Sequence, residues 1–450
     1  MSQKLFGTDG VRGTANIEPI TAAWVLKLAG AAAGVLAKQE SDPTVIVGRD
    51  TRVSGEMLES AIAAGLASCG VDVLIAGIVP TPAIAYLTPT HQAAFGVVIS
   101  ASHNPFQDNG IKFFGPDGYK LSDRLELAIE AEFFGNDSPR LATRKSIGRI
   151  RRLRDSIEQY AAFACSTVPK GFSLSGTTIA IDAANGAAHE TTPLVLSKLG
   201  ARIELIAATP NGFNINKECG STHPERLCEL VRKTGAEFGV AHDGDADRLL
   251  FCDETGDPLD GDELMAIAGV DLLSRGQLRD NALVTTVMSN FGLDVVFNDR
   301  GGKVLRTNVG DRYVIDALIQ HELNFGGEQS GHLIFKDFVT TGDGLVSALQ
   351  VMEIMQRTGK PLSELRTVMK KFPQVLRNVV VREKSPFEQF SGLMKQVAEA
   401  QSRLAGKGRV LLRYSGTEPL ARLLLEGPDA GELDQLAEGI IQELAKNLGT

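Results

Sequence analysis

Short apolar runs that end abruptly in polar loops constrain the fold of this 450-residue chain more than any other feature. The run Phe95–Ile99 is rich in β-branched residues, which suit a buried strand, and it stops in Ser-Ala-Ser-His-Asn-Pro. The runs Phe238–Ala241 and Leu323–Phe325 stop in Asp-Gly-Asp-Ala-Asp-Arg and Gly-Gly-Glu-Gln-Ser-Gly-His. Because open α/β sheets place their active sites at the carboxyl edge of the strands, the three loops are candidate functional segments.

The same order of strands and helices recurs before each of these loops. Strand patterns alternate with helical patterns, which predicts helix-covered parallel sheets in three related α/β units. The other predicted strands of these units are Thr44–Val47, Val71–Ala76, Thr178–Ile181, Arg202–Ile206, Leu283–Val287 and Val304–Thr307. From about Phe372 the pattern of predicted strands and helices changes. Strands at 379–381, 410–413 and 422–425 with helices at 387–404 and 431–447 predict an α+β domain.

Charge and cysteine content exclude several classes of function. The net charge is -9 and no long basic run occurs, which argues against nucleic acid and anionic membranes as partners. The five cysteines form no Cys-x-x-Cys pair, which argues against a disulfide framework or a zinc ribbon. The amino terminus has no signal pattern, and the most apolar window, 22–37, is too short to span a bilayer. We therefore expect a cytoplasmic protein.

The loop Asp243-Gly-Asp245-Ala-Asp247-Arg248 carries the clearest chemical signal. Carboxylates two residues apart in an extended loop can point the same way and converge on a hard cation, and all-oxygen ligands favour Mg²⁺. An EF-hand is one alternative, but Arg248 stands where that loop needs a glycine. A second alternative is a loop in which Asp243 itself accepts a phosphoryl group. A third is an acidic turn splayed into water.

The segment 413–422 is a candidate phosphate site. Hydroxyls, amides and two guanidinium groups follow a strand there, as phosphate recognition requires, and the alternative is a Ser-Gly-Thr turn flanked by surface arginines. The residues concerned are Arg413, Ser415, Gly416, Thr417 and Arg422.

The other candidate side chains belong to the Gly-Gly-Glu and Ser-His loops. Glu328 and Ser330 offer an acceptor and a hydroxyl to sugar hydroxyl or amine groups, unless the segment is only a glycine-rich hairpin. Ser102 and His103 follow a predicted buried strand and are candidates for catalysis, although an ordinary strand-to-loop turn would contain the same residue types. Lys112 could serve in acid/base catalysis or neutralise a phosphate, unless it is a surface lysine.

These motifs resemble those of the α-D-phosphohexomutase superfamily over essentially the whole chain. The opening FGTDGVRG, ISASHNPFQDNGIKFF, DGDADR, GGEQSGH and RYSGTEPLAR are most similar to those of bacterial phosphoglucosamine mutases. The resemblance implies three similar mixed α/β domains and a C-terminal α+β domain around a central active-site cleft. The expected divisions are 1–150, 151–255, 256–371 and 372–450.

The resemblance also implies roles for individual residues. Ser102 would be a phosphoserine, and its phosphate would hold Mg²⁺ together with Asp243, Asp245 and Asp247. Glu328 and Ser330 would bind the sugar, and the 413–422 segment its non-reacting phosphate. Lys112 and Arg12 match positions of acid/base or phosphoryl-stabilising residues, and His103 is a neighbour of the phosphate. Arg248 and Asp311 are further cleft candidates, and Asp311 stands where phosphomannomutases commonly carry histidine.

The implied reaction is the reversible conversion of glucosamine 6-phosphate to glucosamine 1-phosphate through a 1,6-bisphosphate. The product would feed the synthesis of UDP-N-acetylglucosamine and the cell wall. The partner is thus a small sugar phosphate, and a homodimer is left open. Three alternatives stay open: a phosphomannomutase/phosphoglucomutase, an aspartyl-phosphate mutase or phosphatase, and a non-catalytic sugar-phosphate sensor.

Overall fold

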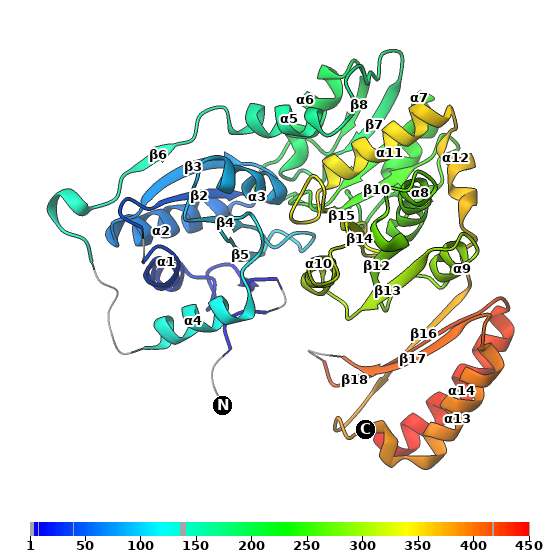
Figure 1. Ribbon diagram of the computed structural model, residues 1–450. Coiled ribbons are helices and arrows are strands. Elements are labelled where there is room, and N and C mark those ends of the chain that lie inside the picture. The colour runs from blue at the N-terminus through cyan, green and yellow to red at the C-terminus, as the bar shows by residue number, and fades with distance from the viewer. Residues whose placement is uncertain (1–3, 8, 39, 136–140, 416–417, 450) are drawn as a thin grey trace. The chain divides into compact units, whose positions relative to one another are not determined.

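The computed structural model describes residues 4–7, 9–38, 40–135, 141–415 and 418–449 (Figure 1). Contacts divide the chain into two compact units. The first comprises the chain up to Thr286 together with Leu305–Arg366, and the second comprises Val287–Val304 and the chain from Thr367 onward. Each unit is described by itself below.

The first sheet has six strands in the order β1-β5-β4-β2-β3-β6. Its strands are β1 Val11–Thr14, β2 Thr44–Arg49, β3 Asp72–Ile78, β4 Phe95–Ile99, β5 Asp108–Phe114 and β6 Ile150–Arg152. Its helices are α1 Ala22–Leu36, α2 Ser54–Ser68, α3 Thr81–Thr90 and α4 Asp123–Phe134. A buried core forms between one face of the sheet and helices α1, α2 and α4. Helix α3 packs on the other face, where Ile84 and Thr88 lie against Gly48 and Gly96.

This sheet is mixed, although the alternation of strands and helices predicted a parallel one. Strands β2, β3, β4 and β6 are parallel, but β5 returns antiparallel to β4 and pairs on its other side with β1. The resemblance to phosphohexomutases implied such a mixed sheet, whereas the alternation of strands and helices gave no sign of β5, because Pro105 stands between the two strands and proline ends regular pairing. The antiparallel return has a functional consequence, because it places Lys112 on a central strand beside the end of β4.

The second sheet has the order β11-β10-β9-β7-β8. Its strands are β7 Thr178–Asp182, β8 Arg202–Ile206, β9 Phe238–His242, β10 Leu249–Cys252 and β11 Pro258–Leu259, and its helices are α5 Ser156–Ser166, α6 Ala188–Lys198 and α7 Glu225–Thr234. Helix α7 covers one face through Leu227 and Val231. The loop between the central strand β9 and its antiparallel neighbour β10 carries the three aspartates.

The third sheet has the order β13-β12-β14-β15. Its strands are β12 Ala282–Thr286, β13 Lys303–Thr307, β14 Phe325–Gly327 and β15 Leu333–Phe335, and the segment's helices are α8 Gly261–Ser274, α9 Gly292–Asn298, α10 Asp311–Gln320, α11 Gly344–Thr358 and α12 Leu362–Leu365. Helix α10 packs on β12 and β14 through Val314 and Leu318. The Gly-Gly-Glu loop forms the turn between β14 and β15.

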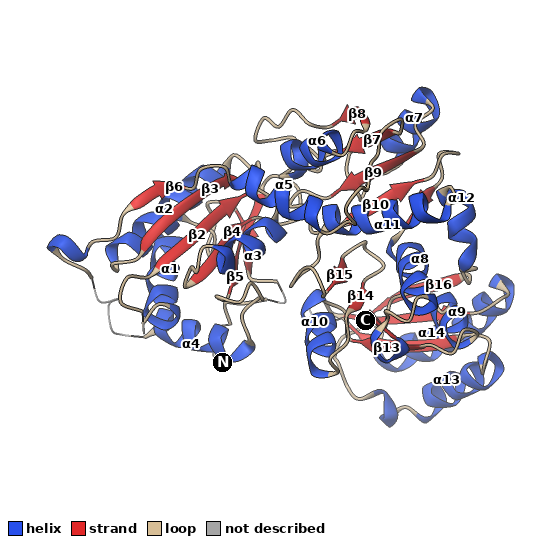
Figure 2. Cartoon of the chain, turned by 45° about the horizontal axis from the view of Figure 1, so that its top comes forward, coloured by secondary structure: helices blue, strands red, loops and turns tan. Residues whose placement is uncertain are grey.

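The C-terminal part is an antiparallel sheet covered by two helices on one face, as Figure 2 shows. Its elements are β16 Gln374–Val380, α13 Ser391–Leu404, β17 Arg409–Tyr414, β18 Leu420–Glu426 and α14 Ala430–Leu448. The predicted α+β domain is thereby confirmed, although its first strand begins at Gln374 rather than Val379. None of the described helices is long and apolar enough to cross a membrane.

Candidate active site

Ser102 lies in the loop between β4 and β5, where the backbone adopts a rare conformation. Its φ is 53°, in the left-handed region that residues other than glycine seldom occupy. The residue is buried, and its hydroxyl donates a hydrogen bond of 2.5 Å to Oδ2 of Asp243. Two loops that the sequence singled out separately therefore meet, although 141 residues separate the two side chains along the chain.

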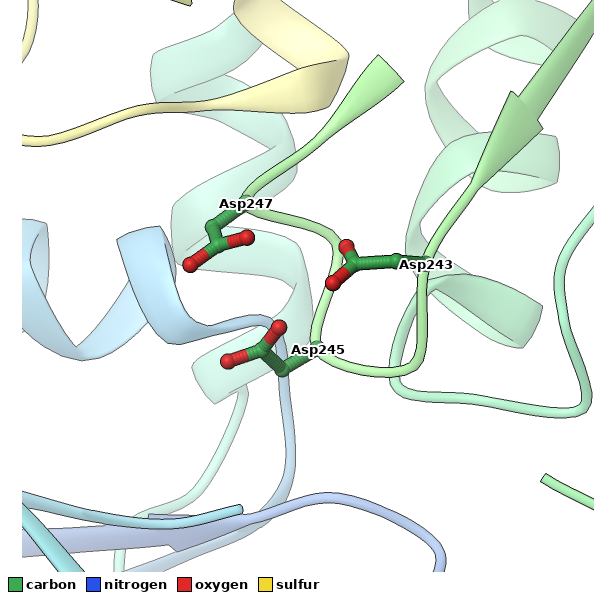
Figure 3. A group of neighbouring side chains, drawn as sticks. All are labelled: Asp243, Asp245 and Asp247. Carbon is green, nitrogen blue, oxygen red and sulfur yellow. The ribbon is translucent and has the colours of Figure 1, made fainter. Parts of the chain in front are cut away.

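The three aspartates form a buried cluster on the β9–β10 loop. One ligand atom from each of Asp243, Asp245 and Asp247 lies within 4.8 Å of the others, and Figure 3 shows their carboxylates turned toward a shared space. Among the described residues, Oδ1 of Asp245 and Oδ1 of Asp247 have no hydrogen-bond partner. Because buried polar atoms without partners are costly and carboxylate oxygens suit hard cations, these residues fit a bound metal ion.

The pKa values of the clustered carboxyl groups shift in opposite directions. Burial raises the pKa of Asp243 well above its usual value, and the charges of Asp247 and Asp245 raise it further. Burial acts in the same direction on the pKa of Asp247, but Lys112 and His332 outweigh it and lower that pKa. Like charges that share a buried site oppose one another's ionisation, which contributes to the raised pKa of Asp243.

Two helices from outside the loop hold it in place. At the start of α3, the buried Thr81 donates from its hydroxyl to Oδ2 of Asp245 at 2.6 Å and from its backbone N–H to the Asp245 carbonyl at 2.9 Å. At the start of α11, the Gly344 N–H donates to the carbonyl of Ala246 at 3.0 Å. A Cβ atom on Gly344 would lie 2.6 Å from the Arg248 carbonyl, so the helix approaches this closely only with glycine there.

Lys112 is fully buried between carboxylates rather than exposed. Its Nζ lies 2.9 Å from Oδ2 of Asp245, 2.9 Å from Asp9 and 3.6 Å from Asp247. Burial alone would lower the pKa of Lys112, but these three carboxylates raise it above its usual value. The lysine is therefore a fixed positive charge beside the predicted metal ligands.

A row of alternating charges continues from Lys112. Asp9 also pairs with Lys120 at 2.5 Å, and Lys120 pairs with Asp311 at the start of α10. Nε2 of His332 lies 3.6 Å from Asp311, and its Nδ1 lies 3.7 Å from Asp247. Burial would lower the pKa of His332, but the carboxylates of Asp247 and Asp311 raise it.

Sequence reasoning missed Asp9, Lys120 and His332 as functional candidates. Asp9 lies in the motif FGTDGVRG and His332 in GGEQSGH, so membership in these recognised motifs could have identified both as functional candidates. No local pattern marks Lys120, since a lysine in a turn is ordinarily a surface residue.

His103 and Arg12, both predicted near the phosphoserine, lie beside the cluster. Nδ1 of His103 is 3.4 Å from the Ser102 hydroxyl. Burial, together with Arg248 and Arg12, lowers the pKa of His103 to about 4, so its ring is neutral at neutral pH. Arg12 pairs with Asp9. Arg248 lies 3.9 Å from Asp247, and its buried Nε has no hydrogen-bond partner within the described part of the chain.

The predicted sugar-binding residues lie in the β14–β15 turn. Oε1 of Glu328 accepts a 3.1 Å hydrogen bond from the backbone N–H of Gly310, which precedes α10 and Asp311. Ser330 is exposed at the tip of the turn. The close packing of the turn is visible at Gly331, where a Cβ atom would lie 1.9 Å from the Leu249 carbonyl at the end of the metal loop.

The predicted phosphate residues belong to the second unit. Arg413 and Arg422 are directly opposite on β17 and β18, an arrangement that like charges disfavour. Arg422 pairs with Glu418, whereas no acid among the described residues pairs with Arg413, whose pKa is lowered by burial and by Arg422. The Ser415 hydroxyl accepts from the Glu418 N–H at 3.3 Å. Gly416 and Thr417 lie outside the described residues.

Four family models match successive parts of the chain. They describe phosphoglucomutase/phosphomannomutase alpha/beta/alpha domain I at residues 3–140, domain II at 156–256, domain III at 260–372 and the C-terminal domain at 376–443. A phosphoglucosamine mutase of Syntrophotalea carbinolica is 49% identical over 100% of this chain and 99% of that protein. One of Citrifermentans bemidjiense is 50% identical over 99% of both.

Solved structures share the fold at lower identity. A phosphoglucomutase/phosphomannomutase family protein from Burkholderia thailandensis has a TM-score of 0.81 at 23% identity and covers 99% of both chains. An Aspergillus fumigatus N-acetylphosphoglucosamine mutase, solved with GlcNAc-6P and magnesium, has a TM-score of 0.69 at 18% identity and covers 98% of this chain and 95% of that one. With matches along its whole length and full-length relatives near 50% identity, the chain belongs to the phosphoglucomutase/phosphomannomutase family.

Proposed function

We propose that this isomerase interconverts glucosamine 6-phosphate and glucosamine 1-phosphate, with Ser102 as the phosphoryl carrier. The observation that carries the proposal is the contact between the buried Ser102 hydroxyl and the aspartate cluster. The full-length phosphoglucosamine mutase relatives support the choice of sugar. Phospho-Ser102 would give its phosphoryl group to O1 of the substrate, and Ser102 would recover one from O6 of the resulting 1,6-bisphosphate.

Asp243, Asp245 and Asp247, together with the phosphate on Ser102, would hold one Mg²⁺. A divalent cation there supplies charge neutralisation for the transferring phosphoryl group. The buried Oδ1 atoms of Asp245 and Asp247, which accept no hydrogen bond from the described residues, support this ligand set. The hydroxyl of Ser102 is held toward the same space by its bond to Asp243.

Lys112 would stabilise phosphoryl charge rather than act as a general base. A base must be able to lose its proton near the working pH, whereas the surrounding carboxylates hold Lys112 protonated. Arg12 would add a second cation from the same side. Because its ring is neutral, His103 would donate a hydrogen bond to the phosphate on Ser102 and would not supply positive charge.

Glu328 and Ser330 would bind the sugar, with Arg248 and Asp311 as cleft residues near them. Glu328 is a carboxylate acceptor, which suits both hydroxyl groups and the ammonium group of glucosamine. Asp311 is held ionised by Lys120, because that ammonium outweighs the effect of burial and lowers the pKa of Asp311. Of these two acids, Glu328 would favour an amino sugar over a neutral one, because the charge of Asp311 is already paired with Lys120.

Arg413, Ser415, Gly416, Thr417 and Arg422 would bind the phosphate that does not react. The unfavourable pairing of two arginines across the β17–β18 hairpin supports this role, since an anion between them would remove their repulsion. Lys384 adds a third cation, because its Nζ bonds to the Ser415 carbonyl at 2.6 Å. One site of this kind would have to accept either end of the bisphosphate.

The predicted division into four domains at residues 150, 255 and 371 is part of the same proposal. A homodimeric state and a cytoplasmic location stay predictions from the sequence.

The test is a comparison of substrates with one enzyme preparation. Purified protein carrying a phosphorylated Ser102 is supplied with Mg²⁺ and with glucosamine, mannose or glucose 6-phosphate, and the 1-phosphate is measured. We expect kcat/KM to be at least about tenfold higher for the glucosamine phosphate. Preferential turnover of mannose or glucose phosphate would instead assign the chain to the neutral-sugar branch of the family, and tight binding without turnover would assign it a sensor role.

A further inference from the structure

Arg52 is a fully buried arginine that the proposed mechanism does not use. It follows β2 in the segment Gly-Arg-Asp-Thr-Arg, and its side chain has no exposed surface. A buried guanidinium group is expensive unless its donors are paired, so its hydrogen bonds identify what it does.

All five N–H donors of the Arg52 guanidinium group have acceptors. The Nε donor bonds to Oδ2 of Asp50 at 2.8 Å. The other four donors bond to backbone carbonyl oxygens of the loop that carries Ser102. Nη2 donates to Ser102 and Asn104, each at 2.8 Å, and Nη1 donates to Pro105 and to Asp108 at 3.0 Å. One side chain thus gathers the carbonyl groups of the whole turn between β4 and β5.

Two further side chains fix the same turn. Nδ2 of Asn216, from the second sheet's segment, donates to the Ser102 carbonyl at 2.9 Å and to the Asn104 carbonyl at 3.0 Å. Asp50, which accepts from Arg52, also accepts from the Ser100 hydroxyl at 2.6 Å, and that hydroxyl accepts from the Ser102 N–H at 2.9 Å. Both the N–H and the carbonyl of Ser102 are therefore held by buried groups.

The turn needs such support because Ser102 has a φ of 53°. A serine in this left-handed region is strained and persists there only when its surroundings fix the backbone. The conformation is the one in which the Ser102 hydroxyl meets Asp243. Without the hydrogen bonds from Arg52 to the carbonyl groups of this turn, the backbone of Ser102 would relax and its hydroxyl would leave this position.

We propose that Arg52, assisted by Asn216, is a positioning residue that holds Ser102 in its strained conformation for phosphoryl transfer. The proposal rests on the proposed function, because it gives Ser102 the role of carrier. Arg52 has no exposed surface and its donors are all occupied within the protein, so its loss should lower kcat and leave substrate binding nearly unchanged. Lysine is a demanding replacement, since it keeps the charge but offers three donors instead of five.

The experiment compares R52K with R232K. Arg232 is an exposed control for the arginine-to-lysine change, because its Nη1 also bonds to a backbone carbonyl, that of Gly256 at 2.8 Å, in a turn that holds none of the candidate site residues. Three quantities are measured in the full-length proteins with Mg²⁺: the melting temperature, kcat and KM for glucosamine 6-phosphate, and amide hydrogen exchange in the peptide covering residues 100–109. If R52K does not fold, N216A replaces it, because that change removes two bonds to the same carbonyl groups and leaves the buried charge pair intact.

For R52K we expect kcat to fall by about thirtyfold or more, KM to stay within about threefold, and exchange in residues 100–109 to accelerate by about tenfold or more. N216A should lower kcat by about five- to tenfold in the same way, and R232K should keep kcat within about twofold. A folded R52K or N216A with unchanged kcat and unchanged exchange would overturn the proposal, as would a rise in KM with kcat unchanged. If the wild-type protein isomerises no glucosamine phosphate, the proposed function fails, and exchange alone then decides the role of Arg52.

Discussion

The surroundings of Ser102 and the β17–β18 hairpin hold charge in opposite ways. Around Ser102, the partly buried carboxylate of Asp9 and the buried carboxylates of Asp245 and Asp247 face the buried cation Lys112 at 2.9–3.6 Å. On the hairpin, Arg413 and Arg422 face each other and only Arg422 has an acidic partner among the described residues. The first region is built around internal ion pairs, whereas the second sets two arginines against each other. We therefore expect the first region to carry the phosphoryl transfer and the second to bind the phosphate that does not react.

The largest effect should follow loss of the Ser102 hydroxyl. S102A removes the proposed phosphoryl carrier and leaves the three aspartates in place, so we expect isomerisation to fall by about a thousandfold or more. The control is S166A. Ser166 is exposed, and its hydroxyl bonds to the Phe163 carbonyl within its own helix. A steady-state assay with glucosamine 6-phosphate checks this, and activity above a tenth of wild type in S102A would rule out the serine mechanism.

A smaller effect should follow loss of the hairpin cations. R413A removes a charge-assisted contact to phosphate, worth about 1.5–3 kcal/mol, so KM should rise by about ten- to a hundredfold. The control is R403A in the same domain, where the arginine pairs with Glu432 at 2.9 Å on the helical face. If R413A and R403A have the same KM, the hairpin is not the phosphate site and the contrast between the two regions is lost.

The support of the metal loop by α3 should appear in metal affinity. T81V keeps the shape of the side chain and removes the 2.6 Å bond to Asp245, so the Mg²⁺ concentration needed for half-maximal activity should rise by about tenfold. T90V on the same helix is the control, because Thr90 is exposed and bonds only to the Tyr86 carbonyl. An unchanged Mg²⁺ requirement in T81V would show that Asp245 does not depend on Thr81.

The smallest effect on activity, and a clear one on stability, should come from Asp343 at the start of α11. Burial raises the pKa of Asp343 to about 6, and its carboxylate accepts from the Tyr160 hydroxyl at 2.8 Å. A raised pKa means that the folded protein holds this proton more tightly than the unfolded chain. Its stabilising contribution is therefore full below the unfolded pKa, near 4, and is lost as the pH rises through 6.

D343N should remove this dependence and keep the acceptor for the Val346 N–H. Relative to D343N, the wild type should lose up to about 3 kcal/mol of its free energy of unfolding between pH 4 and pH 7. Unfolding in urea at a series of pH values gives the two curves. Parallel curves would mean that the Asp343 carboxyl titrates normally in the folded protein.

Local sequence patterns account for the parts of the site that lie on single loops. The alternation of Asp243, Asp245 and Asp247 between two apolar strands predicted a converging cluster, and the structure shows one. The apolar run before Ser102 predicted β4 with both ends correct. Most other ends of the predicted strands agree within two residues, because β-branched runs and turn residues mark them locally, whereas β1, β5, β6, β10, β11 and β15 were not predicted.

What the sequence could not reveal are contacts between segments far apart in the chain. Lys112 was a candidate from its motif, but its three carboxylate partners became apparent only where β5 turns back beside β4. No local pattern marked Thr81, which bonds to Asp245 from 164 residues away. In the sequence, Arg52 follows the predicted strand Thr44–Val47, and nothing local indicates that it is buried beneath the Ser102 turn. Such roles arise from tertiary packing, for which a single chain gives no local signal.

The most direct test of the central claim is the location of the transferred phosphoryl group. The purified protein is incubated with glucosamine 1,6-bisphosphate and Mg²⁺, and the modified residue is mapped by mass spectrometry. The account predicts one phosphoryl group on Ser102, stable to hydroxylamine, which then passes to glucosamine 6-phosphate. A hydroxylamine-labile phosphoryl group on Asp243, or transfer to substrate by S102A at the wild-type rate, would contradict it.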